Sequence, residues 1–194
     1  MSFNFVINML RLLFVCLFTP TVMATAIDVS LSNETAYVEF LFQDDTRIGV
    51  GGADLGVGVL FNENDDVLFA FEALVTGSTG EQPLQLGAGV KLFTALLEKP
   101  GDDTSSGVAI GGRINYLLPA KKPMSIYSEL FYAPEVTSFG DNEDYLEFSL
   151  GYNLEISPSV YGYVGYRLIQ TKIDDINDDF ELDDNIHLGL RLKF

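Results

Sequence analysis

The sequence predicts an all-β protein, a transmembrane antiparallel up-and-down β-barrel of eight to ten strands that follows an N-terminal signal peptide. Three observations support this class. Short segments of alternating apolar and polar residues recur along the chain and are separated by polar turns, as in membrane strands. The last segment, 186–194, is apolar on one face up to the final residue. No segment after the signal holds the ~20 consecutive apolar residues that a spanning helix needs.

Residues 1–26 have the features of a secretory signal peptide. Arg11 is their only charged residue, an apolar run follows it, and small residues near the end offer cleavage sites. An uncleaved anchor is the alternative, but the apolar run is too short to span a membrane. We therefore expect 27–194 to form one barrel domain. Cys16 is the only cysteine and lies in the signal, so the mature chain lacks thiols, as suits an oxidising compartment.

The composition argues against several kinds of partner. The whole chain carries a formal charge of −17, and loss of Arg11 leaves 10 of the 11 basic side chains against 28 acidic ones. Such acidity argues against nucleic acid and against binding to anionic lipid through a basic patch. Aromatic residues make up 12% of the chain, which fits a β-rich fold better than a disordered acidic chain.

The number of strands follows from the requirement that it be even. A barrel whose chain begins and ends on the periplasmic side needs an even number of strands. Nine alternating segments are evident after residue 34, and adding 27–31, which alternates and precedes a polar turn, gives ten strands. Treating 27–42 as one bent strand and the Gly51 region as a loop gives eight. The sequence favours ten, because nine further segments are evident near 35–42, 47–61, 67–77, 84–97, 106–118, 125–135, 144–156, 159–172 and 184–194.

Alternation assigns the two faces of these segments. It is clearest over 145–156, where the even positions are apolar or aromatic and the odd positions are polar or small. The segments 84–96 and 108–118 repeat the pattern. Where tyrosines occupy both faces, we expect Glu129 and Arg167 to mark the lumen face, because charges are costly against lipid. A change of apolar parity near Gly51 and Gly52 predicts a bulge there.

The terminal strand, 186–194, alternates strictly. An exposed apolar strand at the end of a soluble protein would invite aggregation, whereas the same strand in a membrane barrel meets lipid. We expect this strand also to be the part that the barrel-assembly machinery recognises. The residues of its apolar face, expected to contact the membrane, are Ile186, Leu188, Leu190, Leu192 and Phe194.

The connections divide into two groups. Counting back from the terminal strand places those near 43–46, 78–83, 119–124 and 157–158 in the periplasm, and the mostly longer ones near 62–66, 98–106, 136–143 and 173–183 outside. The outer group is acidic, so we expect contact with lipopolysaccharide through divalent cations as well as contact with outer-membrane lipids. A dedicated calcium loop is not expected, because Phe180 and Ile186 replace the required Gly and Glu. The acidic residues assigned to this side are Glu63, Asp65, Asp66, Asp102, Asp103, Asp141, Glu143, Asp174, Asp175, Asp178, Asp179, Glu181 and Asp183.

Three segments resemble the YfaZ-type outer-membrane proteins: the glycine-rich 49–58, the aromatic 127–135, and Gly162–Arg167 with its alternating Gly and Tyr. These are small predicted barrels of similar length with a cleaved signal. The resemblance covers the whole mature chain. It implies a barrel fold in the bacterial outer membrane and supplies no catalytic residues.

The polar parity predicts the content of the lumen. In a barrel of this size the bore is nearly filled by side chains, and opposite charges within it are expected to pair. The function indicated is therefore a structural barrel with a salt-bridged lumen or a narrow porin-like channel that prefers cations at its outer mouth. The charged side chains expected to face inward are Glu39, Glu72, Lys91, Arg113, Glu129, Glu147, Glu155, Arg167, His187, Arg191 and Lys193.

Two other functions fit parts of the sequence. His187, the only histidine, follows Asp183 and Asp184, so a lipid-modifying enzyme is conceivable, but no nucleophile lies at a fixed spacing from it. A soluble periplasmic β-barrel binding protein is the second alternative, since alternation does not distinguish the inside from the outside. We expect no enzymatic activity and no cofactor or metal, because the sequence shows no metal-ligand spacing and no phosphate-binding loop.

Overall fold

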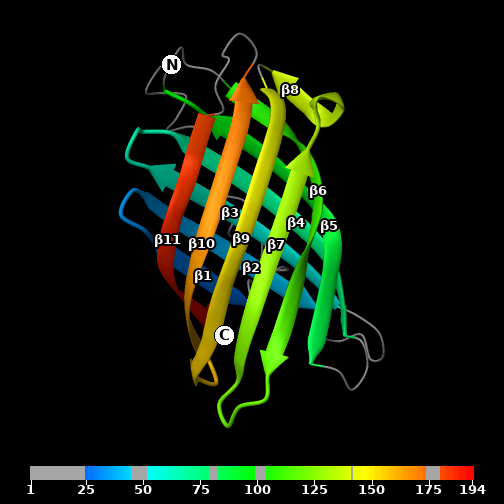
Figure 1. Cartoon of the computed structure of the whole chain (residues 1–194), viewed down its shortest axis with the longest axis vertical. Coiled ribbons are helices and arrows are strands. Elements are labelled where there is room, and N and C mark those ends of the chain that lie inside the picture. Colours follow the sequence, from blue (N-terminus) through cyan, green and yellow to red (C-terminus); the bar gives the residue numbers. More distant parts are fainter. Residues whose placement is uncertain (1–24, 45–51, 79–82, 99–103, 141, 174–179) are drawn as a thin grey trace.

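The protein is a closed antiparallel β-barrel of ten strands (Figure 1). This computed structural model describes residues 25–44, 52–78, 83–98, 104–140, 142–173 and 180–194. The fold class and the count of ten, which depends on the short first strand, are confirmed. The strands are β1 (Ala26–Leu31), β2 (Thr35–Asp44), β3 (Gly52–Asn62), β4 (Val67–Ser78), β5 (Leu84–Leu96), β6 (Thr104–Leu118), β7 (Met124–Ala133), β9 (Asn142–Ser157), β10 (Val160–Ile173) and β11 (Phe180–Lys193), with a short β8 (Ser138–Gly140) beside β6.

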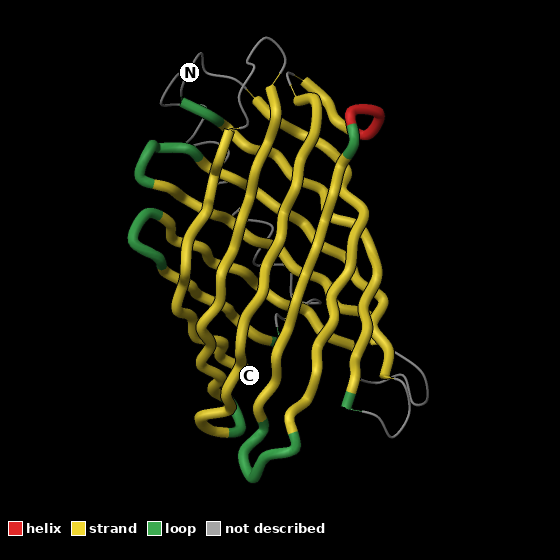
Figure 2. Tube along the Cα trace, viewed as in Figure 1, coloured by secondary structure: helices red, strands yellow, loops and turns green. Residues whose placement is uncertain are grey.

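The barrel closes where its first and last strands pair. Residue Ala26 lies opposite Lys193 and Leu31 lies opposite Leu188 in an antiparallel ladder. All other barrel strands pair with their neighbours in the chain, β7 with β9 across the short η1–β8 excursion. Figure 2 shows that strands make up nearly all of the described trace and that helix is limited to the single 3-10 turn η1 (Glu135–Thr137). No helix in the described ranges is long and apolar enough to cross a membrane.

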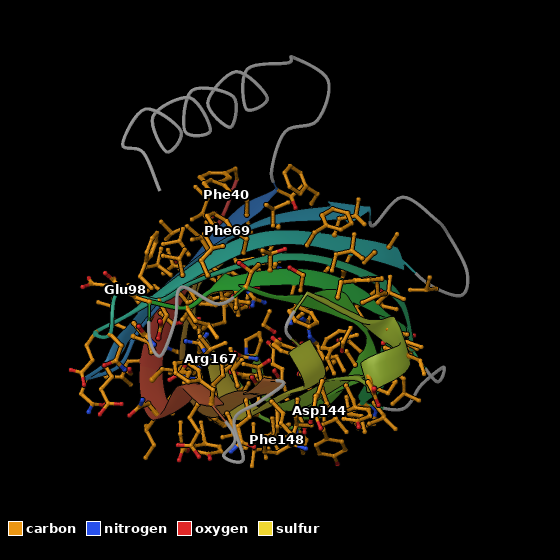
Figure 3. The ribbon with its side chains drawn as sticks, turned by 90° about the horizontal axis from the view of Figure 1, so that it is seen from above. Phe40, Phe69, Glu98, Asp144, Phe148 and Arg167 are labelled. Atoms are coloured by element: carbon orange, nitrogen blue, oxygen red, sulfur yellow. The ribbon has the colours of Figure 1, made fainter. Side chains whose placement is uncertain are left out.

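The outer surface of the barrel is apolar. Phe40, Phe69 and Phe148 project away from the wall when the barrel is viewed along its length (Figure 3). An exposed apolar belt around a closed barrel is the surface that hydrocarbon covers in an outer-membrane protein. Nine of the barrel strands carry a large apolar side chain that is at least 38% exposed, for example Val29, Val57, Phe71, Leu92, Ile110, Leu130, Leu150, Val164 and Leu188.

The lumen is divided into two halves of different chemistry. We call the end where β1 begins and β11 ends the periplasmic end, because an even number of strands returns the chain to the side from which it entered. Toward the opposite, outer end, inward side chains form an apolar plug in which Phe93 and Tyr145 stack with ring centroids 3.9 Å apart. None of its residues is more than 3% exposed, and they are Leu60, Leu68, Phe93, Ala95, Leu97, Ala109, Phe131, Ala133, Tyr145, Ile169 and Leu182.

The plug departs from the expected polar lumen. At the level of the plug, segments of β4, β5 and β7 are apolar on both faces, so the alternation that marks the lumen elsewhere is absent there. The physical reason is that inward side chains that exclude water are selected for packing, as in a protein core. A few polar side chains are also buried in this half, among them Ser105 and Thr171, which hydrogen-bond to each other, but most of the predicted lumen charges lie in the periplasmic half.

The start of β11 corrects one expected boundary. Glu181 and Asp183, assigned to an outer loop, lie in a strand that begins at Phe180. The pairing of β10 with β11 runs without interruption from His187 to Asp183, so Asp183 shares the lumen face of His187 and is 2% exposed; the register shifts only beyond it, between Ile169 and Gln170. Residues 1–24 of the expected signal, Gly51 of the expected bulge and the acidic residues at 102, 103, 141 and 174–179 fall outside the described residues, whereas Ala26, assigned to the end of the signal, is the first residue of β1.

Candidate functional site

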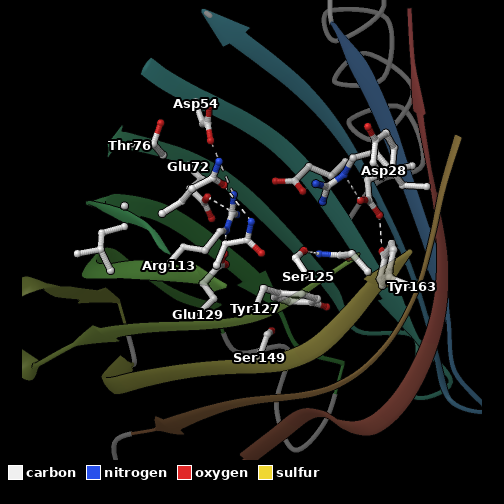
Figure 4. Close-up of a pocket in the computed structure, with 18 of the residues that line it drawn as sticks. Asp28, Asp54, Glu72, Thr76, Arg113, Ser125, Tyr127, Glu129, Ser149 and Tyr163 are labelled. Atoms are coloured by element: carbon white, nitrogen blue, oxygen red, sulfur yellow. Dashed lines mark hydrogen bonds and ion pairs between the residues drawn. The ribbon is translucent and has the colours of Figure 1, made fainter. Parts of the chain in front are cut away.

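A cavity of about 680 Å³ occupies the periplasmic half of the lumen (Figure 4). We call it the vestibule. Residues at the periplasmic ends of the strands line its rim, among them Gly52, Ser78, Gln85 and Lys193. Its inner part is lined by charged side chains, including Lys91, which lies next to the plug. The vestibule is therefore a polar chamber that extends from the periplasmic rim to the plug.

Lys91 is the centre of a buried ion cluster. Its Nζ lies 2.8 Å from Oε1 of Glu147, 3.1 Å from Oε2 of Glu72 and 3.5 Å from Oε1 of Glu129. Its side chain is 3% exposed, and its Nζ also lies 4.4 Å from the centre of the Phe131 ring in the plug. One ammonium group thus links β4, β5, β7 and β9 immediately below the plug.

Arg113 is the second cation of this cluster. Its Nε lies 2.5 Å from Oε2 of Glu129, its Nη2 lies 3.0 Å from Oε1 of Glu72, and its Nη1 lies 4.0 Å from Oδ2 of Asp54. The strand register explains part of this arrangement, since Arg113 is the cross-strand partner of Glu129 and Lys91 that of Glu72. The remaining contacts reach across the lumen and depend on the barrel being closed.

A second group of charges lies on the wall formed by β10, β11 and β1. Arg191 Nε lies 2.7 Å from Oδ2 of Asp28, and Arg167 Nε lies 2.6 Å from Oδ2 of Asp183. Asp28 also accepts a hydrogen bond from the Tyr163 hydroxyl. These pairs leave the carboxylates of this wall neutralised, because each buried Asp faces one guanidinium.

Tyrosine rings lie against the backbone of β9 and β11 at positions where glycines leave room. A Cβ at Gly189 would overlap the ring of Tyr163, and a Cβ at Gly151 would overlap the ring of Tyr127. Glycine is thus required by the close approach of an aromatic ring to the backbone. The rings add packing to the wall without crossing the lumen, which keeps the vestibule open.

The structure brings most of the charges that the sequence assigned to the lumen into two groups. Glu72, Lys91, Arg113, Glu129 and Glu147 meet in the ion cluster, and Arg167, His187 and Arg191 lie along the β10–β11 wall. His187 is 3% exposed and lies edge-on to Tyr163, and its Nδ1 has no hydrogen-bond partner among the described residues. The apolar face of the terminal strand points away from the lumen, with exposed fractions from 43% at Leu192 to 77% at Phe194.

Several lumen residues were not assigned to the lumen from the sequence. Asp28 and Asp54 pair with Arg191 and Arg113, and Asp183 pairs with Arg167. The alternation of 27–31 contains the signal for Asp28, since its neighbours Ile27 and Val29 are apolar. Asp183 has the same parity as His187 and Arg191, so its place in the lumen follows once β11 is extended back to Phe180.

The chemistry of the lumen is that of fixed, paired charges. The described part of the chain has no group of three or more His, Cys, Asp or Glu side chains placed to hold a metal ion. The ion cluster holds the wall together from within, and the vestibule offers a polar surface to small solutes.

Comparison with known proteins identifies the family. The KdgM porin in complex with disordered oligogalacturonate is 10% identical with a TM-score of 0.48, and the match covers 87% of this chain and 99% of that one. The NanC porin is 10% identical with a TM-score of 0.45 over the same shares of the two chains. The outer-membrane channel DcaP of Acinetobacter baumannii is 11% identical with a TM-score of 0.42, over 86% of this chain and 54% of that one. No curated protein matches the sequence. The family model described as YfaZ precursor matches residues 5–194, and the chain therefore belongs to the YfaZ family.

Proposed function

We propose that this porin-like outer-membrane barrel acts as a structural barrel with its lumen closed on the outer side. The observation that carries the proposal is the apolar plug, in which the stacked Phe93 and Tyr145 and the buried Phe131 occupy the outer half of the lumen. The ion cluster centred on Lys91 supports the plug from below. An apolar constriction excludes water and ions more strongly than a polar one of the same width.

Conductance of the refolded protein in a planar bilayer tests the proposal. We expect no resolved current steps for the wild type. The double variant Phe93→Ala, Tyr145→Ala removes the stacked pair and should give discrete steps. The matched control is Phe148→Ala, which shortens an aromatic side chain on the outer face (Figure 3) and should stay silent. Wild-type steps as large as those of the double variant would contradict a closed lumen.

A narrow channel is the second candidate function. The vestibule favours it, because a polar chamber already extends from the periplasmic rim to the plug. Passage would then need only a rearrangement of the plug. Small, infrequent wild-type steps that grow in the double variant would support this candidate over a purely structural role.

Three further assignments belong to this proposal. The exposed face of the terminal strand contacts lipid and serves as the segment that the assembly machinery binds. Exposed carboxylates at the outer rim, such as Glu63, Asp65 and Glu98, bind lipopolysaccharide phosphates through divalent cations. Chelation with EDTA should then reduce the lipopolysaccharide that copurifies with the barrel, and an unchanged amount would refute this contact.

The proposal includes no catalytic role for the lumen. His187 is buried on the β10–β11 wall beside Tyr163. Its position fits packing in the wall better than proton transfer to a bound substrate. We also propose that the signal is removed close to residue 26, so that 27–194 is the mature barrel, and N-terminal sequencing of the outer-membrane form tests that boundary.

A further inference from the structure

The vestibule has one carboxylate that forms no ion pair among the described residues. Six carboxylates line it, and five of them, Asp28, Asp54, Glu72, Glu129 and Glu147, form ion pairs. The sixth, Glu39, has no ion pair with any described residue. An unpaired carboxylate among other carboxylates is costly in its ionised form, and either a bound proton or a cation beside it relieves that cost.

The wall around Glu39 is shaped to hold its side chain in one place. Glu39 lies on β2 directly opposite Gly58 on β3, and its side chain extends along the wall over Gly56. A Cβ at Gly56 would overlap Oε1 of Glu39. Next to it on the same face of β2, Tyr37 lies over Gly58 in the same manner. The two glycines form a recess in which the carboxylate lies flat, so that the space in front of it stays open.

The charges around this recess do not compensate Glu39. On β1, its cross-strand partner is Asp28, a second carboxylate that already forms an ion pair with Arg191. The cations of the ion cluster, Lys91 and Arg113, are shared among Glu72, Glu129 and Glu147. Tyr37, Tyr127 and Tyr163 add aromatic rings to the lining; such faces attract cations, and the Tyr37 ring already has the Arg167 guanidinium 4.8 Å from its centre.

We propose that Glu39 is a cation-binding residue and that the vestibule takes up small monovalent cations, organic ammonium ions or alkali metal ions, from the periplasm. This inference rests on the proposed closed lumen, because the plug makes the vestibule a chamber with a single entrance. The ligand pairs with the Glu39 carboxylate within the recess over Gly56. The surplus negative charge of the lining selects against anions.

Binding is tested on the refolded full barrel in detergent micelles, with methylammonium chloride as the probe. The backbone amide NMR signals of Tyr37, Gly56 and Gly58 should shift in a saturable way. Glu39→Gln should weaken the affinity by roughly tenfold or more, because a pair of unit charges about 4 Å apart at a partly screened site exceeds the free energy of one decade. Gly56→Ala keeps the carboxylate but displaces it, and should also weaken binding.

Controls separate this site from general charge effects. Glu155→Gln removes a lumen-facing carboxylate that does not line the vestibule, and should leave the affinity unchanged. Potassium chloride that competes with methylammonium would show that alkali ions share the site, and its failure to compete would assign the site to ammonium groups. Both results retain Glu39 as the binding residue. Equal binding by Glu39→Gln and wild type, with unchanged heat-modifiable gel mobility, would overturn the inference. Current steps in the wild type would instead overturn the closed lumen and leave these shifts intact.

Discussion

Replacing Lys91 tests whether the ion cluster stabilises the barrel. Three glutamates share Lys91 and Arg113, with contacts to Lys91 between 2.8 and 3.5 Å. Lys91→Met keeps the length of the side chain but removes its charge, which leaves three carboxylates beside one guanidinium. Removing one partner of a buried ion pair costs about 3–5 kcal/mol, and we expect a loss of this size in the free energy of unfolding.

The measurement is urea unfolding in lipid vesicles, followed by heat-modifiable gel mobility. The matched control is Lys193→Met at the periplasmic rim, where the lysine is exposed and contacts the Tyr161 ring. This control should cost no more than about 1 kcal/mol. The double variant Lys91→Met, Glu147→Gln should recover part of the loss, since it removes one of the repelling carboxylates. If Lys91→Met unfolds at the same urea concentration as the control, the cluster does not stabilise the wall.

Three further substitutions test the other layers of the barrel in the same unfolding assay. Leu190→Arg places a charge on the outer apolar face and should cost about 2–4 kcal/mol if that face lies near the centre of the bilayer; a neutral effect would indicate that lipid does not cover it. Gly189→Ala should cost about 1–3 kcal/mol, because its Cβ would overlap the Tyr163 ring, and wild-type stability would show that the ring moves freely. Phe93→Ala should cost about 3–5 kcal/mol through the cavity it leaves in the plug, and a cost below about 1 kcal/mol would mean that the plug is loosely packed.

Most of the charged side chains that face the lumen were predicted from the sequence. A strand places successive side chains on opposite faces, so the parity of Glu129 and Arg167 followed from the apolar residues beside them. The same argument counted the strands once the even number was required. Strand boundaries were harder to predict, since the last strand begins at Phe180 and not at 184, and it therefore includes Asp183.

The plug could not be read from alternation. In segments such as 67–71 both parities are apolar, and a pattern of period two then carries no information about which face is inside. Phe93 and Tyr145 stack across the lumen although 52 positions separate them in the sequence. Contacts of this kind depend on the diameter of the closed barrel and on the register of every strand between them.

The sequence by itself determined that this chain forms alternating β-strands and which face of most strands is apolar, and it favoured a membrane barrel of ten strands over eight, because those properties depend on local alternation and on the even count. Only the tertiary structure decided that an apolar plug lies above a polar chamber, that Lys91 joins three glutamates, and that Glu39 has no ion pair among the described residues. Those properties depend on distances across the lumen, which no local pattern encodes.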